Sequence, residues 1–216
     1  MVLLWQEGRS YLAILAVVAV GAYLLYPPLL ILPFLGVGFL AYFFRDPERA
    51  HPEEKQGEVT FLSPADGKVM VVAEVDEPYF FAGPAKLVTI FLSPLDVHVN
   101  RAPIAGEVVG VRHKKGLFRP AFLADAPSVN ERNYVAIRGE STQCLLVQIV
   151  GVVARRVVCW VKMGDKLERG AKFGVMKFGS SMQVFMPLAA TCTVRAGERV
   201  VGGETVIGVI SRAELG

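Results

Sequence analysis

The run Leu145-Leu146-Val147-Gln148-Ile149-Val150 decides the fold class, because it is one of several short apolar segments that alternate with turns. Segments of this kind, bounded by Gly, Pro and Asp, are typical of β-strands. The clearest others are residues 69–73, 87–92, 134–137 and 156–161. Many short strands predict a barrel or a sandwich, so we expect a mainly β, barrel-sandwich-like domain over residues 47–216. Within it, residues 120–126 are the one stretch that could form a helix.

The N-terminal part differs in composition from the rest. Of the 216 residues, 53% are hydrophobic and the mean hydropathy is +0.43, and the excess lies in residues 11–44, which contain no charge. This segment exceeds the roughly 20 residues that one membrane helix needs. Pro27-Pro28 divides it into halves of about 16 residues, each slightly short for a full span. We expect a tight helical hairpin or a pair of re-entrant helices within residues 1–46. We expect the segment to be retained, because no small-residue cleavage site follows the apolar run.

The charges that flank this segment predict its orientation. Arg9 precedes the first half, Arg45 and Arg49 follow the second, and the link between the halves carries no charge. The positive-inside rule therefore places both ends, and residues 47–216 with them, on the cytoplasmic face of the cell membrane. A buried helical pair in a soluble core is the alternative, but neither half has a polar face to present to water.

The net charge indicates which binding partners to expect, and the cysteines indicate the redox compartment. The net charge is +3 with a pI near 8.8, and no basic helix or zinc-finger spacing indicates nucleic acid. An anionic membrane surface is the more natural partner. Cys144, Cys159 and Cys192 are odd in number and lie in apolar surroundings, which predicts buried free thiols in a reducing compartment. No metal site is expected.

A weak internal repeat accompanies the strand pattern. Residues 164–170 recur 33 residues later as residues 197–203, and residues 105–110 are a fainter third copy. The arrangement resembles the barrel-sandwich of biotinyl and lipoyl carrier domains. Glycine-rich turns between strands look alike in any case, so the repeat and a chance likeness both stay open.

The sequence Phe178-Gly179-Ser180-Ser181 predicts self-cleavage. A serine hydroxyl can attack the preceding carbonyl when that residue is glycine, because glycine has no Cβ to block the approach. The resulting ester, after elimination and hydrolysis, would leave a pyruvoyl group at position 180, an electron sink like PLP. Ser181 could attack only the more hindered carbonyl of Ser180. Most Gly-Ser-Ser sequences are ordinary turns, so the case depends on the rest of the chain.

The rest of the chain resembles the phosphatidylserine decarboxylase proenzymes, particularly their short form. The resemblance covers nearly the whole chain, including Phe43-Phe44-Arg45-Asp46-Pro47. Besides the Gly-Ser-Ser sequence it rests on Ser63-Pro64-Ala65-Asp66-Gly67-Lys68-Val69, Phe91-Leu92-Ser93-Pro94-Leu95-Asp96-Val97-His98-Val99-Asn100-Arg101-Ala102-Pro103 and Asn130-Glu131-Arg132-Asn133.

The resemblance implies a specific activity. The chain would cut itself between Gly179 and Ser180 into two chains that stay associated, with a covalent pyruvoyl cofactor derived from Ser180. Phosphatidylserine would bind this group as a Schiff base and lose CO2 to give phosphatidylethanolamine. The oligomeric state, including a homo-oligomer, stays open.

His98 and Asp66 are the candidate catalytic residues beside Ser180. A serine needs a base to become a nucleophile, and a histidine oriented by a carboxylate is the usual one. His98 lies in the motif that resembles the active-site loop of the family, and it is also the candidate proton donor in decarboxylation. Asp66 matches the aspartate that the family uses in self-cleavage, although an Asp-Gly pair is also a common turn. The other two histidines, His51 and His113, are interpreted as surface residues.

The chain departs from the family at one position of the processing site. Many relatives have a second histidine three residues after the first, paired with the aspartate, and this chain has Arg101 there. Three alternatives follow: His98 serves both reactions, Asp66 acts more directly, or His113 reaches in. We favour His98 with Asp66.

Two other functions compete with this interpretation. A membrane-tethered carrier module would use Met176-Lys177-Phe178, which is similar to the Met-Lys-Met hairpin that carries biotin, but it would not need the Asp66 and His98 motifs. A pyruvoyl decarboxylase of a soluble amino acid would share the chemistry but would not need residues 11–44.

Residues 112–122 mix cationic and aromatic side chains. They are either a second contact with anionic lipid or a solvated turn.

Overall fold

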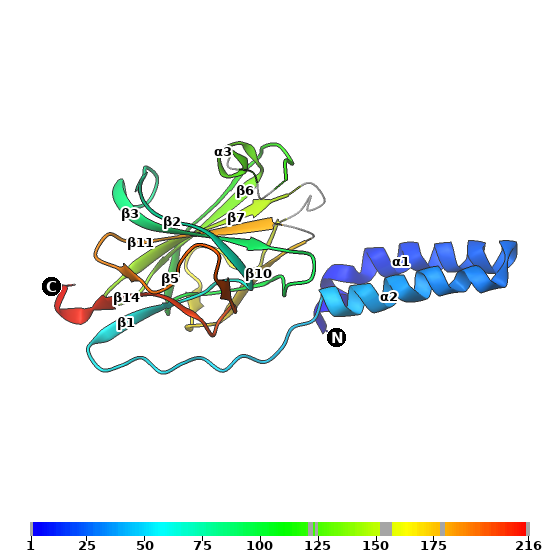
Figure 1. The fold of residues 1–216 in the computed structure, drawn as a ribbon, viewed down its shortest axis with the longest axis horizontal. Coiled ribbons are helices and arrows are strands. Elements are labelled where there is room, and N and C mark those ends of the chain that lie inside the picture. The colour runs from blue at the N-terminus through cyan, green and yellow to red at the C-terminus, as the bar shows by residue number, and fades with distance from the viewer. Residues whose placement is uncertain (1, 121–122, 124, 152–156, 178–179, 215–216) are drawn as a thin grey trace. The chain divides into compact units, whose positions relative to one another are not determined.

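The computed structural model of the chain describes residues 2–120, 123, 125–151, 157–177 and 180–214 (Figure 1). The chain forms two compact units, Met1–Glu48 and Arg49–Gly216. The first is helical, and the second consists mostly of β-strands with two short helical turns. The prediction of a mainly β domain preceded by a helical hairpin is confirmed.

The helical unit consists of α1 (Val2–Leu25), a 3-10 turn η1 (Pro27–Leu30) and α2 (Ile31–Phe43). The two prolines that begin η1 end α1, because proline lacks the N–H that would continue the helical hydrogen bonds. The helices then run back along each other (Figure 1). They approach closely at Gly36, where a Cβ atom would lie 2.9 Å from a methyl carbon of Leu15.

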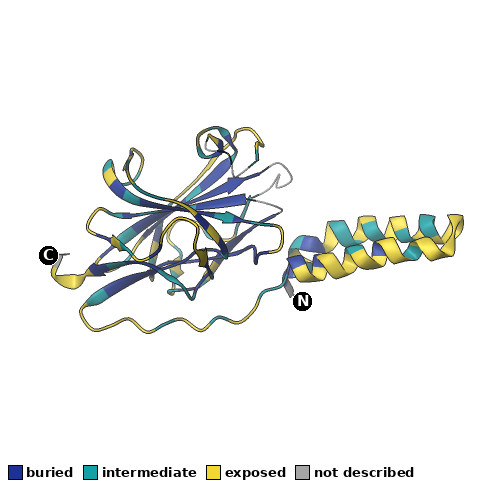
Figure 2. Ribbon diagram, viewed as in Figure 1, coloured by how far each residue is buried: buried dark blue, intermediate teal, exposed yellow. Residues whose placement is uncertain are grey.

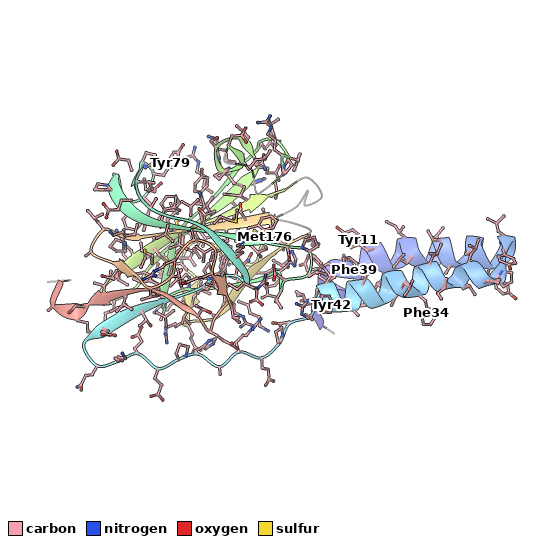
Figure 3. The ribbon with its side chains drawn as sticks, in the orientation of Figure 1. Tyr11, Phe34, Phe39, Tyr42, Tyr79 and Met176 are labelled. Carbon is pink, nitrogen blue, oxygen red and sulfur yellow. The ribbon has the colours of Figure 1, made fainter. Side chains whose placement is uncertain are left out.

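Helix α1 is longer than the uncharged segment alone predicts. It has 24 residues and includes Glu7 and Arg9, since both residue types are good helix formers and do not interrupt a helix. Leu3–Leu25 is long and apolar enough to cross a membrane, whereas the apolar helix Pro27–Phe43 is shorter. Most of the apolar side chains of the hairpin are exposed (Figure 2), and Phe34 points outward at 80% exposure (Figure 3). These features favour membrane association of the hairpin.

The β unit is dominated by an antiparallel sheet of eight strands in the order β13-β2-β3-β11-β7-β6-β5-β9. Its strands are β2 (Gly67–Glu77), β3 (Gly83–Leu92), β5 (Gly106–Lys114), β6 (Arg132–Arg138), β7 (Gln143–Val150), β9 (Lys166–Leu167), β11 (Ser180–Pro187) and β13 (Arg199–Val200).

Two sheets of three strands, β1-β14-β12 and β4-β10-β8, complete the β unit. Their strands are β1 (Glu58–Leu62), β4 (Val99–Arg101), β8 (Val157–Cys159), β10 (Lys172–Met176), β12 (Thr191–Cys192) and β14 (Val206–Ser211). The remaining elements are α3 (Ala126–Val129) and the 3-10 turn η2 (Arg212–Glu214). The five predicted strand runs all contain strands of the structure. Of the predicted helix over residues 120–126, residues 121, 122 and 124 lie outside the described part of the chain, and the four-residue α3 begins at its last residue, Ala126.

The hydrophobic core lies between the large sheet and the two small sheets. Phe61 of β1, Phe173 and Met176 of β10, and Ile90 and Met182 of the large sheet are all fully buried in it. Figure 3 shows Met176 in the interior of the β unit. Full burial of such side chains contributes about 1.5–3 kcal/mol each. The outer face of the large sheet carries a smaller apolar cluster, which Phe80 and Phe81 from the β2–β3 connection partly cover.

The internal repeat has a structural counterpart. In each copy a short strand, β9 or β13, lies between two glycines whose φ angles are positive. These are Gly164 (93°) and Gly170 (80°) in the first copy, and Gly197 (96°) and Gly203 (80°) in the second. The first glycine of each copy also donates a hydrogen bond of 2.8 Å to a strand of the large sheet, from Gly164 to Val108 and from Gly197 to Val69. The two segments therefore fold alike, beyond the general likeness of glycine-rich turns.

His51 lies where the two copies meet. Its ring contacts the second glycine of each copy, since a Cβ atom on Gly170 would lie 2.2 Å from Cε1 of His51 and one on Gly203 would lie 3.3 Å from it. Its Nδ1 donates a hydrogen bond of 2.6 Å to the Gly203 carbonyl. The interpretation of His51 as a simple surface residue is therefore incomplete, because the exposed ring is also held between two glycines.

The glycines test this packing of His51. Gly164→Ala adds a Cβ at a positive φ with no atom nearby, so we expect it to lower the free energy of unfolding by about 1 kcal/mol. Gly170→Ala adds the same strain and a clash with the ring, so we expect a loss of about 2–4 kcal/mol. Denaturant unfolding of the detergent-solubilised chain measures both. In Gly170→Ala/His51→Ala the loss should return towards that of Gly164→Ala, and no such recovery would show that the ring is not the obstacle.

Candidate active site

Ser180 is the first residue of the central strand β11. It pairs with Leu92 of β3 on one side and with Val150 of β7 on the other. Its side chain is fully buried, and its Oγ makes no hydrogen bond within the described part of the chain. The predicted cleavage partner Gly179, and Phe178 before it, lie outside the described residues. The structure thus places a buried hydroxyl, unpartnered among the described residues, at the head of an interior strand.

Ser180 and Ser181 face opposite sides of the large sheet, because side chains alternate along a strand. Ser180 lies on the same face as Met182 and Val184, which belong to the core between the sheets. Ser181 lies on the face of Phe185, which packs in the outer cluster. Strand β4, which directly follows His98, lies over the face of Ser180, because Asn100 of β4 bonds to Gln148 on that face. This arrangement favours Ser180 over Ser181 as the reactive serine.

His98 lies directly before β4 and is 1% exposed. Its Nδ1 is 2.9 Å from the carbonyl oxygen of Asp96. A carbonyl can only accept a hydrogen bond, so Nδ1 carries the proton and the lone pair of the neutral ring is on Nε2. The His98 carbonyl also accepts a bond of 3.1 Å from the N–H of Met176, the last residue of β10. His98 is thereby tied to a strand that ends only a few residues before Ser180.

Asp96 fixes the loop that carries His98, and the sequence did not indicate this role. Its buried carboxylate accepts hydrogen bonds from the N–H (2.8 Å) and hydroxyl (2.7 Å) of Ser93 and forms an ion pair with Arg199. The Ser-x-x-Asp spacing of the loop is the signal that could have indicated it. Asp96 therefore positions both the backbone and the tautomer of His98.

A chain of buried amides lies on the same sheet face as Ser180. Asn133 donates a hydrogen bond of 3.0 Å to Gln148, and Gln148 donates one of 2.8 Å to Asn100, two residues after His98. Gln148 pairs with Met182 across the β7–β11 ladder. Gly174 leaves room for this chain, since a Cβ there would lie 3.0 Å from the Gln148 amide nitrogen. The chain therefore connects the large sheet to the loop of His98.

Asp66 lies at the start of β2, and its carboxylate has other partners. Arg49 donates to both of its oxygens (2.8 and 3.0 Å), and the N–H of Gly202 donates to Oδ1 (2.8 Å). Because β2 is two strands from β11, Asp66 is about 10 Å from Ser180 measured across the sheet. The structure thus brings Asp66 to the same end of the sheet as Ser180, but it pairs Asp66 with an arginine.

Arg101, which replaces the second histidine of many relatives, lies beside the Asp66 loop. It is buried, its N–H donates to the Pro64 carbonyl (2.9 Å) and its guanidinium donates to the Gly170 carbonyl (3.3 Å). His113 lies elsewhere: its side chain is half exposed, contacts Glu131 at 3.2 Å and belongs to β5. Strand β5 is three strands from β11, or about 14 Å, which disfavours His113 as a base.

Lys177 bears on the carrier alternative. A lysine that receives biotin must reach another enzyme, whereas Lys177 is only 8% exposed. Met176 before it is fully buried. This burial disfavours a carrier module.

The cysteines are free thiols in the structure. Cys144 is buried in the core, while Cys159 and Cys192 are partly buried, and burial raises the pKa of all three thiols. Among the described residues, no group of three or more His, Cys, Asp or Glu side chains could hold a metal ion.

These features define a class of protein: an enzyme whose candidate nucleophile and histidine are both buried in the interior of a β domain. The sequence model described as Phosphatidylserine decarboxylase matches residues 37–208. The chain is 46% identical to the phosphatidylserine decarboxylase proenzyme of Carboxydothermus hydrogenoformans over 208 residues, which cover 96% of each chain. The chain belongs to the phosphatidylserine decarboxylase family.

Two further relatives agree with this assignment. The phosphatidylserine decarboxylase proenzyme of Symbiobacterium thermophilum is 48% identical over 171 residues, covering 79% of this chain and 78% of the relative. The phosphatidylserine decarboxylase proenzyme of Salinibacter ruber is 41% identical over 198 residues, which cover 91% of this chain and 87% of the relative. All three relatives carry the name of a proenzyme.

The amide chain gives a prediction for stability. Gln148→Leu would leave the amides of Asn100 and Asn133 buried without their partner, so we expect it to lower the free energy of unfolding by about 2–4 kcal/mol. Gln183→Leu is the matched control, because the half-buried Gln183 makes only a long bond of 3.4 Å to Thr89, and we expect it to cost less than about 1 kcal/mol. Urea unfolding followed by circular dichroism measures both. Equal losses would contradict the role given to the amide chain.

Proposed function

We propose that this chain decarboxylates phosphatidylserine to phosphatidylethanolamine and CO2, using a pyruvoyl group formed from Ser180 by self-cleavage at Gly179-Ser180. The observation that carries the proposal is the position of Ser180 at the head of a central strand, with its side chain on the inner face of the sheet. Its buried hydroxyl, like that of Ser181 on the outer face, has no hydrogen-bond partner among the described residues. Membership of the family and the proenzyme names of its relatives support the same chemistry.

The surroundings of Ser180 suit a pyruvoyl group. A buried hydroxyl without a partner costs about 1–3 kcal/mol, so a serine kept there for structure alone is unfavourable. A pyruvoyl group at this position would lack the hydroxyl and would be held by its own backbone in β11. When formed, it supplies an electrophilic carbonyl that takes up the substrate amine and withdraws electrons from the substrate Cα.

Self-cleavage follows from the serine itself. Oγ of Ser180 attacks the carbonyl carbon of residue 179, the C–N bond breaks, and the hydroxyl proton passes to the nitrogen, which gives an ester. Loss of the Ser180 Cα proton and departure of the carboxylate of residue 179 then leave a dehydroalanine. Its imine tautomer takes up water and releases ammonia, so the new N-terminus ends in a ketone.

His98 is the residue of this chain best suited to move protons in both reactions. Its Nδ1–H is held by the Asp96 carbonyl, which leaves Nε2 as the basic atom of the neutral ring and the acidic atom of the charged one. In decarboxylation we assign it the delivery of a proton to the substrate Cα after CO2 has left. The apolar interior favours this step, because a carboxylate is destabilised on leaving water and CO2 is not.

Asp66 has a second part in the proposal. It lies at the end of the sheet where Ser180 lies, and its ion pair with Arg49 fixes the turn before β2. We assign Asp66 to self-cleavage, where it orients the groups around Ser180, and not to decarboxylation.

The two chains produced by cleavage would stay associated in one folded protein. The chain that begins at Ser180 contributes β11 to the centre of the large sheet, where it pairs with β3 and β7. It also contributes β13, which pairs with β2, and β14, which pairs with β1. These ladders support continued association of the chains without a covalent link.

The location follows from the hairpin. We propose that α1 and α2 attach the enzyme to the cell membrane, with the β unit on the cytoplasmic face as the flanking arginines indicate. A lipid substrate gives such an attachment a purpose, which a soluble amino acid would not. This favours phosphatidylserine over the soluble alternatives.

Processing can be tested by intact mass. The wild-type protein should consist of a chain of residues 1–179 and a chain of residues 180–216 of about 4 kDa that begins in a pyruvoyl group. Ser180→Ala should give one uncut chain, because it lacks the nucleophile. Ser181→Ala, the matched control, should still be cut. A single chain in an active wild-type preparation would refute the proposal, and cutting lost only in Ser181→Ala would move the cleavage by one residue.

Decarboxylation can be separated from processing through His98. In any His98→Ala protein that has been cut, formation of phosphatidylethanolamine should fall about 100- to 10,000-fold, as is usual when a positioned acid or base is lost. Asp66→Asn should instead slow the appearance of the short chain while leaving the turnover of cut protein near that of the wild type. Release of CO2 from carboxyl-labelled phosphatidylserine, normalised to the amount of short chain, measures both effects. Normal turnover by cut His98→Ala would assign the proton transfer to another residue.

A further inference from the structure

We propose that residues 111–119, at the end of β5 and in the loop after it, form a docking surface for an anionic phospholipid bilayer beside Ser180. The proposal rests on the proposed function for the identity of the lipid substrate. It concerns a contact made by the β unit itself, in addition to the apolar hairpin. We call these nine residues the docking surface.

All nine residues of the docking surface are exposed. They include three large apolar side chains: Val111 at 37% exposure, and the neighbours Leu117 at 58% and Phe118 at 38%. Single exposed apolar residues are ordinary, but Leu117 and Phe118 are adjacent and lie among cations. Apolar side chains interleaved with Lys and Arg are typical of protein surfaces that enter the headgroup region of a membrane.

The charge of the docking surface is positive. It carries Arg112, Lys114, Lys115 and Arg119, and the carboxylates in contact with it are Asp125, paired with Arg119, and Glu131, paired with His113. Neither Lys114 nor Lys115 forms an ion pair within the described part of the chain, and the Arg112 guanidinium lies 5.4 Å from the centre of the Tyr79 ring. Each lysine or arginine near an anionic membrane surface contributes about 1 kcal/mol of attraction. Charge complementarity therefore favours anionic lipid as the occupant.

The loop is fastened so that its apolar side chains stay outside. The N–H of Leu117 donates a hydrogen bond of 2.8 Å to the Val129 carbonyl, and the Leu117 carbonyl accepts one of 2.9 Å from the Glu131 N–H. Gly116 lies against the same segment so closely that a Cβ would be 2.5 Å from the carbonyl carbon of Asn130. Leu117 could not turn inward without breaking these bonds. Its exposure is thus imposed by the fold.

Asn130 joins the docking surface to the strand beside Ser180. Its side-chain nitrogen donates to the carbonyls of both Arg119 and Val150 at 2.8 Å, and its oxygen accepts from the Arg119 N–H at 3.0 Å. Val150 is the cross-strand partner of Ser180. Asn130 bridges Arg119 and Val150, and one strand spacing separates Val150 from Ser180. The backbone of Arg119 is therefore about 10 Å from Ser180. The headgroup layer of a bilayer is about 5–8 Å thick, so a docked lipid would have a short path to the serine.

Fluorescence quenching tests the contact independently of catalysis. In a full-length chain with Trp5→Phe and Trp160→Phe, Phe118→Trp reports on the docking surface and Leu188→Trp reports on the opposite end of β11. On vesicles of phosphatidylserine and brominated phosphatidylcholine, we expect strong quenching of Phe118→Trp and little of Leu188→Trp. Equal quenching of the two, or a Phe118→Trp signal as open to aqueous acrylamide as in detergent, would overturn the proposal. Shielding from both quenchers would indicate a protein partner and would also overturn it.

Kinetics tests whether the contact serves the substrate. We expect Lys114→Gln/Lys115→Gln to raise the apparent KM for phosphatidylserine bilayers about tenfold at low ionic strength, and high salt to reduce this difference. Turnover of short-chain, monomeric phosphatidylserine should not change. The matched control Lys162→Gln/Lys166→Gln removes two exposed lysines beside the other end of β5 and should behave as the wild type. Equal effects of the two pairs would overturn the proposal. The quenching can also be measured in Ser180→Ala, so quenching without any decarboxylation would refute the proposed function alone.

Discussion

The pairing of β11 on both edges is the interaction on which the rest of the site depends. The strand begins at Ser180, and from that residue onward its backbone is bonded to β3 on one side and β7 on the other. A residue held in this way cannot relax when the chain before it is cut. The ladder therefore fixes the backbone of Ser180 at the head of the strand. Under the proposed self-cleavage, the same pairing would hold the part of the chain that begins at Ser180 in the sheet.

The same ladder determines which groups can approach Ser180. The alternation along β11 sends Ser180 to the inner face of the large sheet and Ser181 to the outer face. The sheet β4-β10-β8 lies over the inner face and brings the loop of His98 with it, while the amide chain from Asn133 through Gln148 to Asn100 connects the two layers. A buried hydroxyl without a partner is unfavourable by itself, and the many apolar contacts of this interior offset that cost.

Local sequence patterns predicted the strands and the hairpin, because a strand or an apolar helix is encoded by neighbouring residues. They could not predict contacts between distant residues. Arg49 and Gly202 reach Asp66 from 17 positions before it and 136 after it, and Arg199 reaches Asp96 across 103 positions. His51 was interpreted as a simple surface residue for the same reason. Ser180, His98 and Asp66 were singled out because family motifs mark them, and their roles in catalysis remain predictions.

The contacts of Asp66 and His98 differ in a way that bears on the missing second histidine. The carboxylate of Asp66 accepts three hydrogen bonds, two from Arg49 and one from Gly202, so it is held in an ion pair. His98 is held differently, because the bond from its Nδ1 to the Asp96 carbonyl leaves the lone pair of the neutral ring on Nε2. Arg101 is turned towards the Gly170 carbonyl and carries a charge that does not titrate near neutral pH. With an arginine in place of the second histidine, these contacts support the proposal that one histidine serves both reactions. Asp66 and Arg49 form an ion pair that holds the turn before β2.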